Sequence, residues 1–226
     1  MRGTRLVLLA LAIAGCAAPS NGGSPRIMAD VPAAPDAGAR YLFHMHGSIV
    51  EELGPSARGR YGQYQYYPTV EALADRGFVV ISEVRGATEP RAYAAKVAAQ
   101  VARLRAAGVP ADHITVTGVS KGGSMTLMSV FAVANPDVRF VIMAGCLRGG
   151  GFARAIAALG NRPPQGRVLS LYDYADPDIG SCSMSFPPTP GLAFEEVVFQ
   201  TGLGHALFFS PEPVWVDRVA AWATAP

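Results

Sequence analysis

One stretch of the sequence, residues 114–125 (ITVTGVSKGGSM), most constrains what this chain can fold into. Residues 114–117 form a β-branched run, which is typical of a strand buried on both faces. Beyond Gly123, apolar residues recur at helical spacing and predict a helix. Residues 118–122 between them fit the pattern G-x-S-x-G. The stretch therefore predicts a strand that turns into a helix without an intervening loop.

The central residue of this turn, Ser120, is predicted to be a nucleophile. So sharp a turn strains its backbone, and Gly118 and Gly122 leave room for it. Its hydroxyl would stand at the carboxyl end of a sheet, above a helix amino terminus whose amides favour negative charge. The pentapeptide alone is common, and the alternative is a glycine-rich turn with an ordinary N-cap serine. The strand and the helix on either side favour the nucleophile.

Short apolar runs alternate with helical patterns from residue 40 onward. Strands are predicted at residues 41–45, 78–82, 114–117, 140–145, 168–172 and 197–200. Helices are predicted at residues 67–76, 91–107, 123 to about 135, 152–159 and 214–224. This alternation predicts the α/β class, with a mainly parallel sheet of about six strands, helices on both faces and ligands at the carboxyl ends of the strands. Only one helix fits between Cys146 and Val168, so no cap domain is expected.

The amino terminus, residues 1–15, is predicted to be a lipoprotein signal peptide. Two arginines precede an apolar run, residues 6–14, that is too short to span a bilayer. The run ends in Ile-Ala-Gly-Cys16, which resembles the lipobox of bacterial lipoproteins, where the peptide is cut before a cysteine that is then lipidated. An ordinary secretory signal and an uncleaved anchor are the alternatives. The resemblance implies a cell-envelope protein anchored through Cys16, and Ala17 in place of aspartate points to the outer membrane, facing the periplasm.

The mature chain is predicted to consist of a tether and one domain. Residues 16–39 are rich in Ala, Pro, Gly, Ser and Asn without periodicity, so they are expected to be flexible. Residues 40–226 are expected to form a single domain. Removal of residues 1–15 takes two arginines and no acids, so Lys+Arg falls from 19 to 17 against 17 Asp+Glu, a net charge of 0. No nucleic-acid partner is predicted, because a neutral domain offers no basic surface.

The cysteines are consistent with export. With Cys16 assigned to lipid, Cys146 and Cys182 remain, an even pair for an oxidising compartment. Each lies at or beyond the end of a predicted strand, so neighbouring strands would bring both thiols to one edge of the sheet. A disulfide between them is predicted, and two buried free thiols are the alternative.

An unassisted serine is a poor nucleophile, so it needs a base, and the base needs an orienting carboxylate. Of the four histidines in the chain, His113 precedes the strand at residues 114–117 and would lie at the wrong end of the sheet. His205 lies in a glycine-flanked loop after the strand at residues 197–200, on the correct edge. We therefore predict that His205 is the base, rather than a hydrogen-bonded surface histidine.

The orienting acid should follow the strand at residues 168–172, where three aspartates occur. Asp176 stands in a turn between alanine and proline and can point toward a neighbouring histidine loop, so it is predicted to be the acid. Asp178 and then Asp173 are the alternatives. A calcium loop is another reading of this cluster, but its spacing matches no calcium template and a distal glutamate ligand is missing.

Acyl transfer also needs donors for the developing oxyanion. One predicted donor is the backbone amide of Lys121, whose side chain is expected to be solvated. The others are the amides of Gly47 and Ser48, in the loop after the first strand. His44 and His46 precede this loop and share a strand face, which would suit a metal pair, but no third ligand is evident and no metal is predicted.

The chain resembles the α/β-hydrolase superfamily in three features: the order Ser120, Asp176, His205 along the sequence, the histidine-glycine loop before them, and the G-x-S-x-G turn. The G-x-S-x-G-G form and the small size are similar to its dienelactone hydrolase and small-esterase branch. The resemblance covers about residues 41–222 and implies a serine hydrolase that cleaves an ester through an acyl-enzyme, without a cofactor. Two features depart from the family. The first two strands common in it are missing, and serine replaces the cysteine typical of dienelactone hydrolases, so that substrate is not implied.

The loops at residues 49–67 and 179–191 are expected to border the cleft, and the first is rich in tyrosine and arginine. The favoured interpretation of its tyrosines is that they are half-buried and pack a long loop. The alternative is an amphipathic wall for a small-molecule ester, with Arg58, Tyr61 and Tyr64 as candidate substrate-binding residues and an arginine, Arg58 or Arg60, for an anionic group. Thioester and amide hydrolysis use the same machinery, so a thioesterase or peptidase is a second hypothesis. A catalytically inactive, lipid-anchored binding protein of the same fold is a third. No oligomeric state is predicted.

Overall fold

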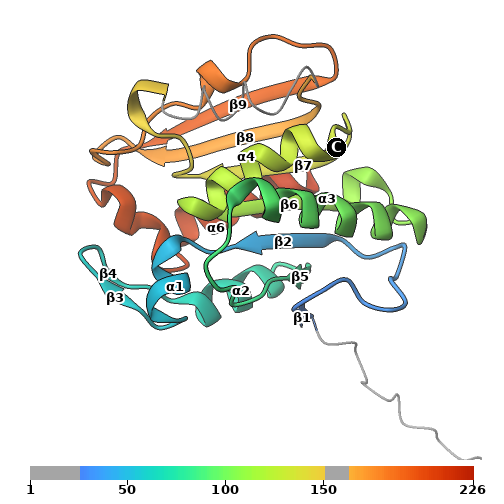
Figure 1. The fold of residues 1–226 in the computed structure, drawn as a ribbon, viewed down its shortest axis with the longest axis horizontal. Coiled ribbons are helices and arrows are strands. Elements are labelled where there is room, and N and C mark those ends of the chain that lie inside the picture. The colour runs from blue at the N-terminus through green and yellow to red at the C-terminus, as the bar shows by residue number, and fades with distance from the viewer. Residues whose placement is uncertain (1–25, 151–162) are drawn as a thin grey trace, which may run out of the picture.

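A seven-stranded sheet runs through the centre of the structure, a computed structural model that describes residues 26–150 and 163–226 (Figure 1). Its strands are β1 (Ile27–Met28), β2 (Tyr41–Met45), β5 (Val79–Ile81), β6 (Ile114–Val119), β7 (Arg139–Met143), β8 (Gly166–Asp173) and β9 (Leu192–Phe199). Their order in the sheet is β1-β5-β2-β6-β7-β8-β9, and each neighbouring pair is parallel. The predicted α/β class is thus confirmed.

Helices cover both faces of the sheet (Figure 1). One face packs against α3 (Pro90–Ala106) and α4 (Lys121–Val133), and the other against α2 (Tyr66–Ala74) and α6 (Pro213–Thr224). Shorter elements occupy the connections: α1 (Ser48–Leu53), the hairpin strands β3 (Arg58–Gly59) and β4 (Gly62–Gln63), and the 3₁₀ turns Ala111–His113, Arg148–Gly150, Ser183–Ser185 and Gly204–Phe208.

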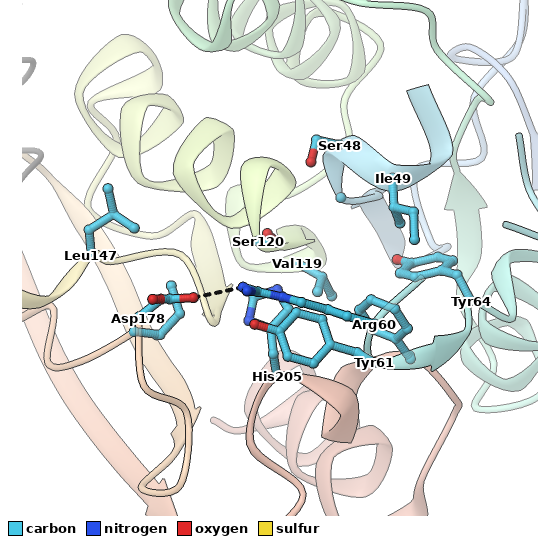
Figure 2. A pocket seen from close by; sticks show the side chains of 13 residues that line it. Ser48, Ile49, Arg60, Tyr61, Tyr64, Val119, Ser120, Leu147, Asp178 and His205 are labelled. Carbon is cyan, nitrogen blue, oxygen red and sulfur yellow. Dashed lines mark hydrogen bonds and ion pairs between the residues drawn. The ribbon is translucent and has the colours of Figure 1, made fainter. Parts of the chain in front are cut away.

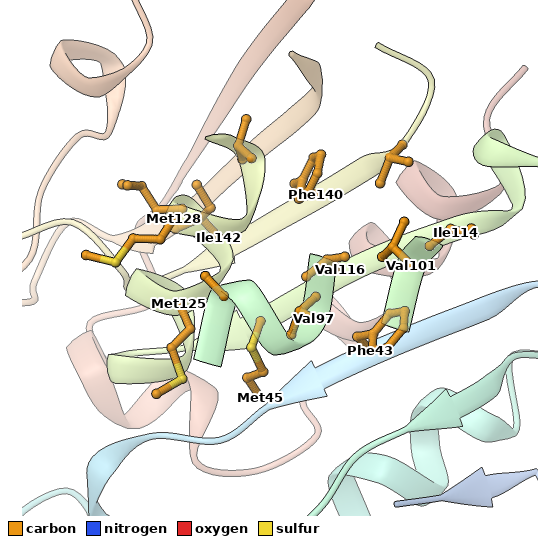
Figure 3. Close-up of a cluster of buried hydrophobic side chains, with 14 of the residues drawn as sticks. Phe43, Met45, Val97, Val101, Ile114, Val116, Met125, Met128, Phe140 and Ile142 are labelled. Carbon is orange, nitrogen blue, oxygen red and sulfur yellow. The ribbon is translucent and has the colours of Figure 1, made fainter. Parts of the chain in front are cut away.

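The central strands are buried on both sides because successive side chains alternate between two helical layers. On β2, Phe43 and Met45 enter the cluster that α3 and α4 cover, where they meet Val116 of β6 (Figure 3). Leu42 points the other way, into the cluster under α2 and α6. Burial on both faces produces continuous apolar runs, and these runs allowed the strands to be predicted from the sequence.

The segment before β2 corrects two predictions. Ile27–Met28 pair with β5 and add a seventh strand to the expected six. Val31 is buried, and Asp30 accepts hydrogen bonds from two side chains of α3. Residues 26–39 therefore belong to the folded domain rather than to a flexible tether. A two-residue edge strand leaves no periodicity in the sequence, which is why composition alone suggested a linker there.

Some predictions concern residues that the structure does not describe, and the predicted start of one strand needs a correction. The signal peptide, Cys16 and the helix at residues 152–159 lie outside the described residues. Within the described ranges, no helix has both the length and the apolar character to cross a membrane. β9 begins at Leu192, earlier than the predicted start at residue 197. The prediction was too short because β9 is a partly exposed edge strand, and its two glutamates interrupt the apolar pattern.

The predicted disulfide between Cys146 and Cys182 is present. The sulfur atoms are 2.05 Å apart and the alpha carbons 5.4 Å apart, within the range that a disulfide requires. Cys146 follows β7 and Cys182 follows β8, and these strands are neighbours in the sheet. The bridge therefore ties together two loops at the carboxyl edge.

Candidate active site

Ser120 occupies the turn between β6 and α4, and its backbone is strained. Its φ of 56° and ψ of −117° lie in a region that side-chain-bearing residues rarely adopt. A Cβ at Gly118 would come within 2.4 Å of the Gly122 carbonyl oxygen, and a Cβ at Gly122 within 2.0 Å of the Met45 oxygen. Both positions therefore require glycine, and this is the local reason for the G-x-S-x-G pattern.

His205 lies in the 3₁₀ turn after β9 and pairs with Asp176, in the loop after β8. Its Nδ1 is 2.6 Å from Asp176 Oδ2, and the Asp176 side chain is only 1% exposed. The other carboxylate oxygen, Oδ1, accepts the backbone amides of Asp178 and Ile179 at 3.0 and 3.2 Å. The carboxylate is thus held on both sides, and a neutral His205 that donates from Nδ1 keeps its Nε2 lone pair free.

The two alternative acids have other partners. Asp173, at the end of β8, accepts the amide and the hydroxyl of Thr201 at 2.8 and 2.6 Å. Asp178 forms an exposed ion pair with Arg60. Of the three aspartates, the geometry therefore joins Asp176 to the histidine, while Asp173 braces the loop that leads to His205.

Ser120 and His205 both line a pocket of about 340 Å³ at the carboxyl edge of the sheet (Figure 2). Most of the remaining lining is apolar or aromatic, from Ile49, Tyr61, Tyr64, Val119, Leu147, Ile179 and Phe209. The Tyr61 ring centroid lies 5.0 Å from that of His205. Such a cavity, apolar with a few polar groups at one point, suits a small organic ligand.

The predicted substrate wall needs one correction. Tyr61 and Tyr64 line the pocket, but Arg58 does not, because it bonds Gln63 across the hairpin of β3 and β4. Arg60 lies there instead. It packs over the Tyr61 ring at 4.5 Å and reaches Asp178 at 2.8 Å (Figure 2). A hairpin turn of this kind reverses the chain within two residues, so the sequence could not reveal which arginine faces the cleft.

Of the three predicted oxyanion donors, Gly47 and Ser48 line this pocket, and Lys121 directly follows Ser120, which also lines it. Gly47 approaches Ser120 closely, since a Cβ on Gly47 would lie 3.4 Å from the serine Cβ. Ser48 and Lys121 are the first residues of α1 and α4, where backbone amides have no acceptor within the helix. Gly47 and Ser48 line the pocket beside Ser120. Amides at helix amino termini favour negative charge, so this corner suits an oxyanion.

The side chain of Lys121 is not solvated as expected. Its Nζ lies 2.6 Å from Oε2 of Glu51, whose side chain is 3% exposed. The other Glu51 oxygen accepts Nε of Arg85 at 2.9 Å. Neither Glu51 nor Arg85 is part of a recognisable motif, so no sequence pattern pointed to this buried ion cluster.

His44 and His46 are buried behind this corner and carry no charge at neutral pH. Burial, aided by the positive charge of Arg85, lowers the pKa of His46 to about 4. His46 Nδ1 lies 2.9 Å from the Gly47 carbonyl oxygen, and Nε2 accepts the Arg85 amide at 3.0 Å. Both ring nitrogens of His46 are therefore occupied by protein groups. No cluster of three potential metal ligands occurs in the described part of the chain.

The sequence matches no protein-family model and no curated protein, whereas the structure matches solved ones. Arabidopsis thaliana SOBER1 is similar at a TM-score of 0.54 and 14% identity, over 82% of this chain and 97% of that one. The chain has the α/β-hydrolase fold. Carboxylesterase CesB from Bacillus subtilis is similar at a TM-score of 0.49 and 15% identity, over 85% of this chain and 86% of that one. A protein described as a "Putative Dienelactone Hydrolase", from Klebsiella pneumoniae, is similar at a TM-score of 0.48 and 17% identity, over 86% of this chain and 90% of that one.

Within the α/β-hydrolase fold, the positions of the candidate residues follow from topology. Ser120 follows β6, Asp176 follows β8 and His205 follows β9, and all three strands end at the same edge of the sheet. Parallel strands with helical crossovers bring every such loop to one side. Residues far apart in the sequence are thereby collected around one pocket.

Proposed function

We propose that the protein is a serine hydrolase that cleaves a carboxylic ester through an acyl-enzyme. The observation that carries this proposal is the strained Ser120 beside a buried Asp176–His205 pair at one pocket. A serine hydroxyl needs a neighbouring base with a free lone pair, and the base needs a carboxylate to hold its ring. This chain supplies all three at the carboxyl edge of its sheet.

In the proposed reaction, Ser120 Oγ attacks the ester carbonyl carbon while His205 Nε2 takes the hydroxyl proton. The tetrahedral intermediate collapses, the carbon–oxygen bond to the alcohol breaks, and His205 returns the proton to the departing alcohol. Water then attacks the acyl-serine with His205 again as base, which releases the acid and restores Ser120. Asp176 stabilises the imidazolium in both halves without taking its proton.

The amides of Lys121, Gly47 and Ser48 are proposed to donate to the oxyanion in both tetrahedral intermediates. The size and apolar lining of the pocket favour a small ester with an apolar acyl or alcohol group. Arg60, at the mouth, is proposed to bind an anionic group of the substrate in competition with Asp178.

A fluorophosphonate probe tests the proposal directly, because it reacts with activated serines. We expect covalent labelling of the full chain and turnover of a p-nitrophenyl ester, with both lost in Ser120→Ala. Ser129→Ala is a matched control, since this serine lies on the same helix, away from the pocket, and its hydroxyl donates to the Met125 carbonyl oxygen. It should label like the parent. A folded parent that neither labels nor turns over ester would contradict the hydrolase and favour an inactive binding protein of the same fold.

A further inference from the structure

The proposed reaction does not use Glu51, a buried carboxylate on α1. Its side chain is 3% exposed, and an unpaired carboxylate at such a position would be strongly destabilising. It is paired twice, with Arg85 Nε at 2.9 Å and with Lys121 Nζ at 2.6 Å. Two cations share this one carboxylate, so the cluster carries a net positive charge.

The Glu51–Lys121 ion pair joins the two proposed sources of oxyanion donors. Lys121 follows Ser120, and its amide is the donor from the nucleophile turn. Glu51 lies on α1, a helix whose N-cap Gly47 and first residue Ser48 are the donors from the other side. These segments are 70 residues apart in the sequence at the Glu51–Lys121 contact. The ion pair therefore links the two segments that carry the proposed oxyanion donors.

The Glu51–Arg85 ion pair extends the link to the chain just before Gly47. Arg85, whose side chain is 4% exposed, donates from Nη2 to the His46 carbonyl oxygen and from its backbone amide to His46 Nε2. His46 in turn donates from Nδ1 to the Gly47 carbonyl oxygen at 2.9 Å. The peptide groups on both sides of Gly47 are thus held by a chain of contacts that begins at Glu51.

We propose that Glu51 is a positioning residue for the oxyanion hole, an inference that rests on the proposed serine hydrolase. It holds the Gly47 and Ser48 amides in register with the Lys121 amide. Misplacement of reacting groups by about 1 Å can cost on the order of 100-fold in rate, so a side-chain contact that aligns the two segments beyond their paired strands can affect the reaction strongly.

A positioning role and a purely structural role make different kinetic predictions. Oxyanion donors act on charge that exists only in the transition state, so their misalignment lowers kcat and leaves KM nearly unchanged. A loss of stability instead lowers the amount of folded enzyme, and each remaining folded molecule works normally.

Glu51→Gln compared with Glu52→Gln is the decisive pair of variants. Glu52 is the next residue and is exposed, and its substitution by glutamine removes one negative charge, as Glu51→Gln does. At equal folded concentration, we expect kcat for a p-nitrophenyl ester to fall by about 10- to 100-fold in Glu51→Gln, with KM within about threefold and no change in Glu52→Gln. Should Glu51→Gln fail to fold, Lys121→Met keeps the Arg85–Glu51 pair and should still lower kcat. Equal kcat values in the folded variant and the Glu52→Gln control would overturn the inference.

Hydrogen exchange separates this inference from the proposed function. In Glu51→Gln, and not in Glu52→Gln, we expect faster amide exchange in both residues 44–53 and residues 120–124, whether or not the parent hydrolyses esters. Unchanged exchange in these two segments would overturn the role of Glu51 as their link. A parent protein without probe labelling or ester turnover would overturn the proposed hydrolase function. The exchange result would still decide whether Glu51 links residues 44–53 to residues 120–124.

Discussion

The two sides of the pocket are held in place by different kinds of interaction. On the oxyanion side, the buried charges of Glu51, Arg85 and Lys121 join the segments that follow β2, β5 and β6, which are neighbouring strands of the sheet. On the opposite side, backbone amides fix Asp176 and a disulfide secures the adjoining loop. The first side depends on ionisation and on burial, whereas the second depends mainly on the path of the backbone.

The Asp176 side contains several contacts that do not change with pH near neutrality. Arg148 donates to the Asp176 carbonyl oxygen at 2.7 Å, and the Gly180 amide donates to the Cys146 carbonyl at 3.0 Å. Together with the bridge from Cys146 to Cys182, these contacts join the loop after β8 to the loop after β7. The Asp176–His205 pair is thus held mainly by backbone contacts and a disulfide, whereas the proposed oxyanion corner adjoins side-chain charges from three segments of the chain.

The largest expected effect tests the side that holds Asp176. Asp176→Asn should lower kcat by about 10,000-fold, because the amide favours the wrong histidine tautomer and cannot stabilise the imidazolium. This loss should exceed that of Glu51→Gln, since one residue acts on the base and the other only on alignment. Steady-state kinetics and circular dichroism of the variant check it. A loss below tenfold in a folded variant would show that Asp176 is not the orienting acid.

A second prediction concerns stability on the oxyanion side. Burial, with smaller contributions from His46 and Arg85, lowers the pKa of His44 from 6.5 to about 3. Between these values the unfolded chain binds the proton and the folded chain does not, so stability is full above pH 6.5 and falls as the pH drops toward 3. Between pH 7 and pH 5, this one group should cost about 2 kcal/mol of unfolding free energy.

His44→Leu should reduce that pH dependence. Neither His44 ring nitrogen has a hydrogen-bond partner among the described residues, so leucine breaks no such bond there. Urea unfolding of the parent and the variant at pH 7 and pH 5 measures the difference. An identical loss of stability in both proteins would contradict the prediction and would place the pH sensitivity elsewhere.

The smallest expected effect lies where the two sides meet at the pocket mouth, in the exposed Arg60–Asp178 pair. Arg60→Ala should raise KM about fivefold for an ester that carries a carboxylate, and leave a neutral ester unchanged. Asp178→Asn should lower KM for the same anionic ester, because it frees the guanidinium. Arg58→Ala, an arginine from the same hairpin outside the pocket, is the matched control. Equal losses on both esters in Arg60→Ala would exclude charge recognition by this residue.

Local sequence patterns predicted much of the fold. The glycines around Ser120 are required by backbone contacts within the turn and with β2, so the pattern alone indicated the turn. The central strands β2 and β6 were predicted because they are buried on both faces and are therefore largely apolar. Of the two edge strands, β1 was not predicted and β9 was predicted too short. His205 and Asp176 could be predicted because strand order decides which loops share an edge. The lipid anchor at Cys16 stays a prediction.

By itself, the sequence determined the order of the longer strands and helices, the turn at Ser120 and the edge of the sheet at which Asp176 and His205 would lie. Only the tertiary structure decided which side chains meet across that edge. The Arg60–Asp178 contact joins residues 118 positions apart, and Glu51 reaches Lys121 across 70. Periodic burial is written into neighbouring residues, because strands and helices repeat every few positions. Ion pairs between loops have no such period, since they depend on how the whole chain is folded.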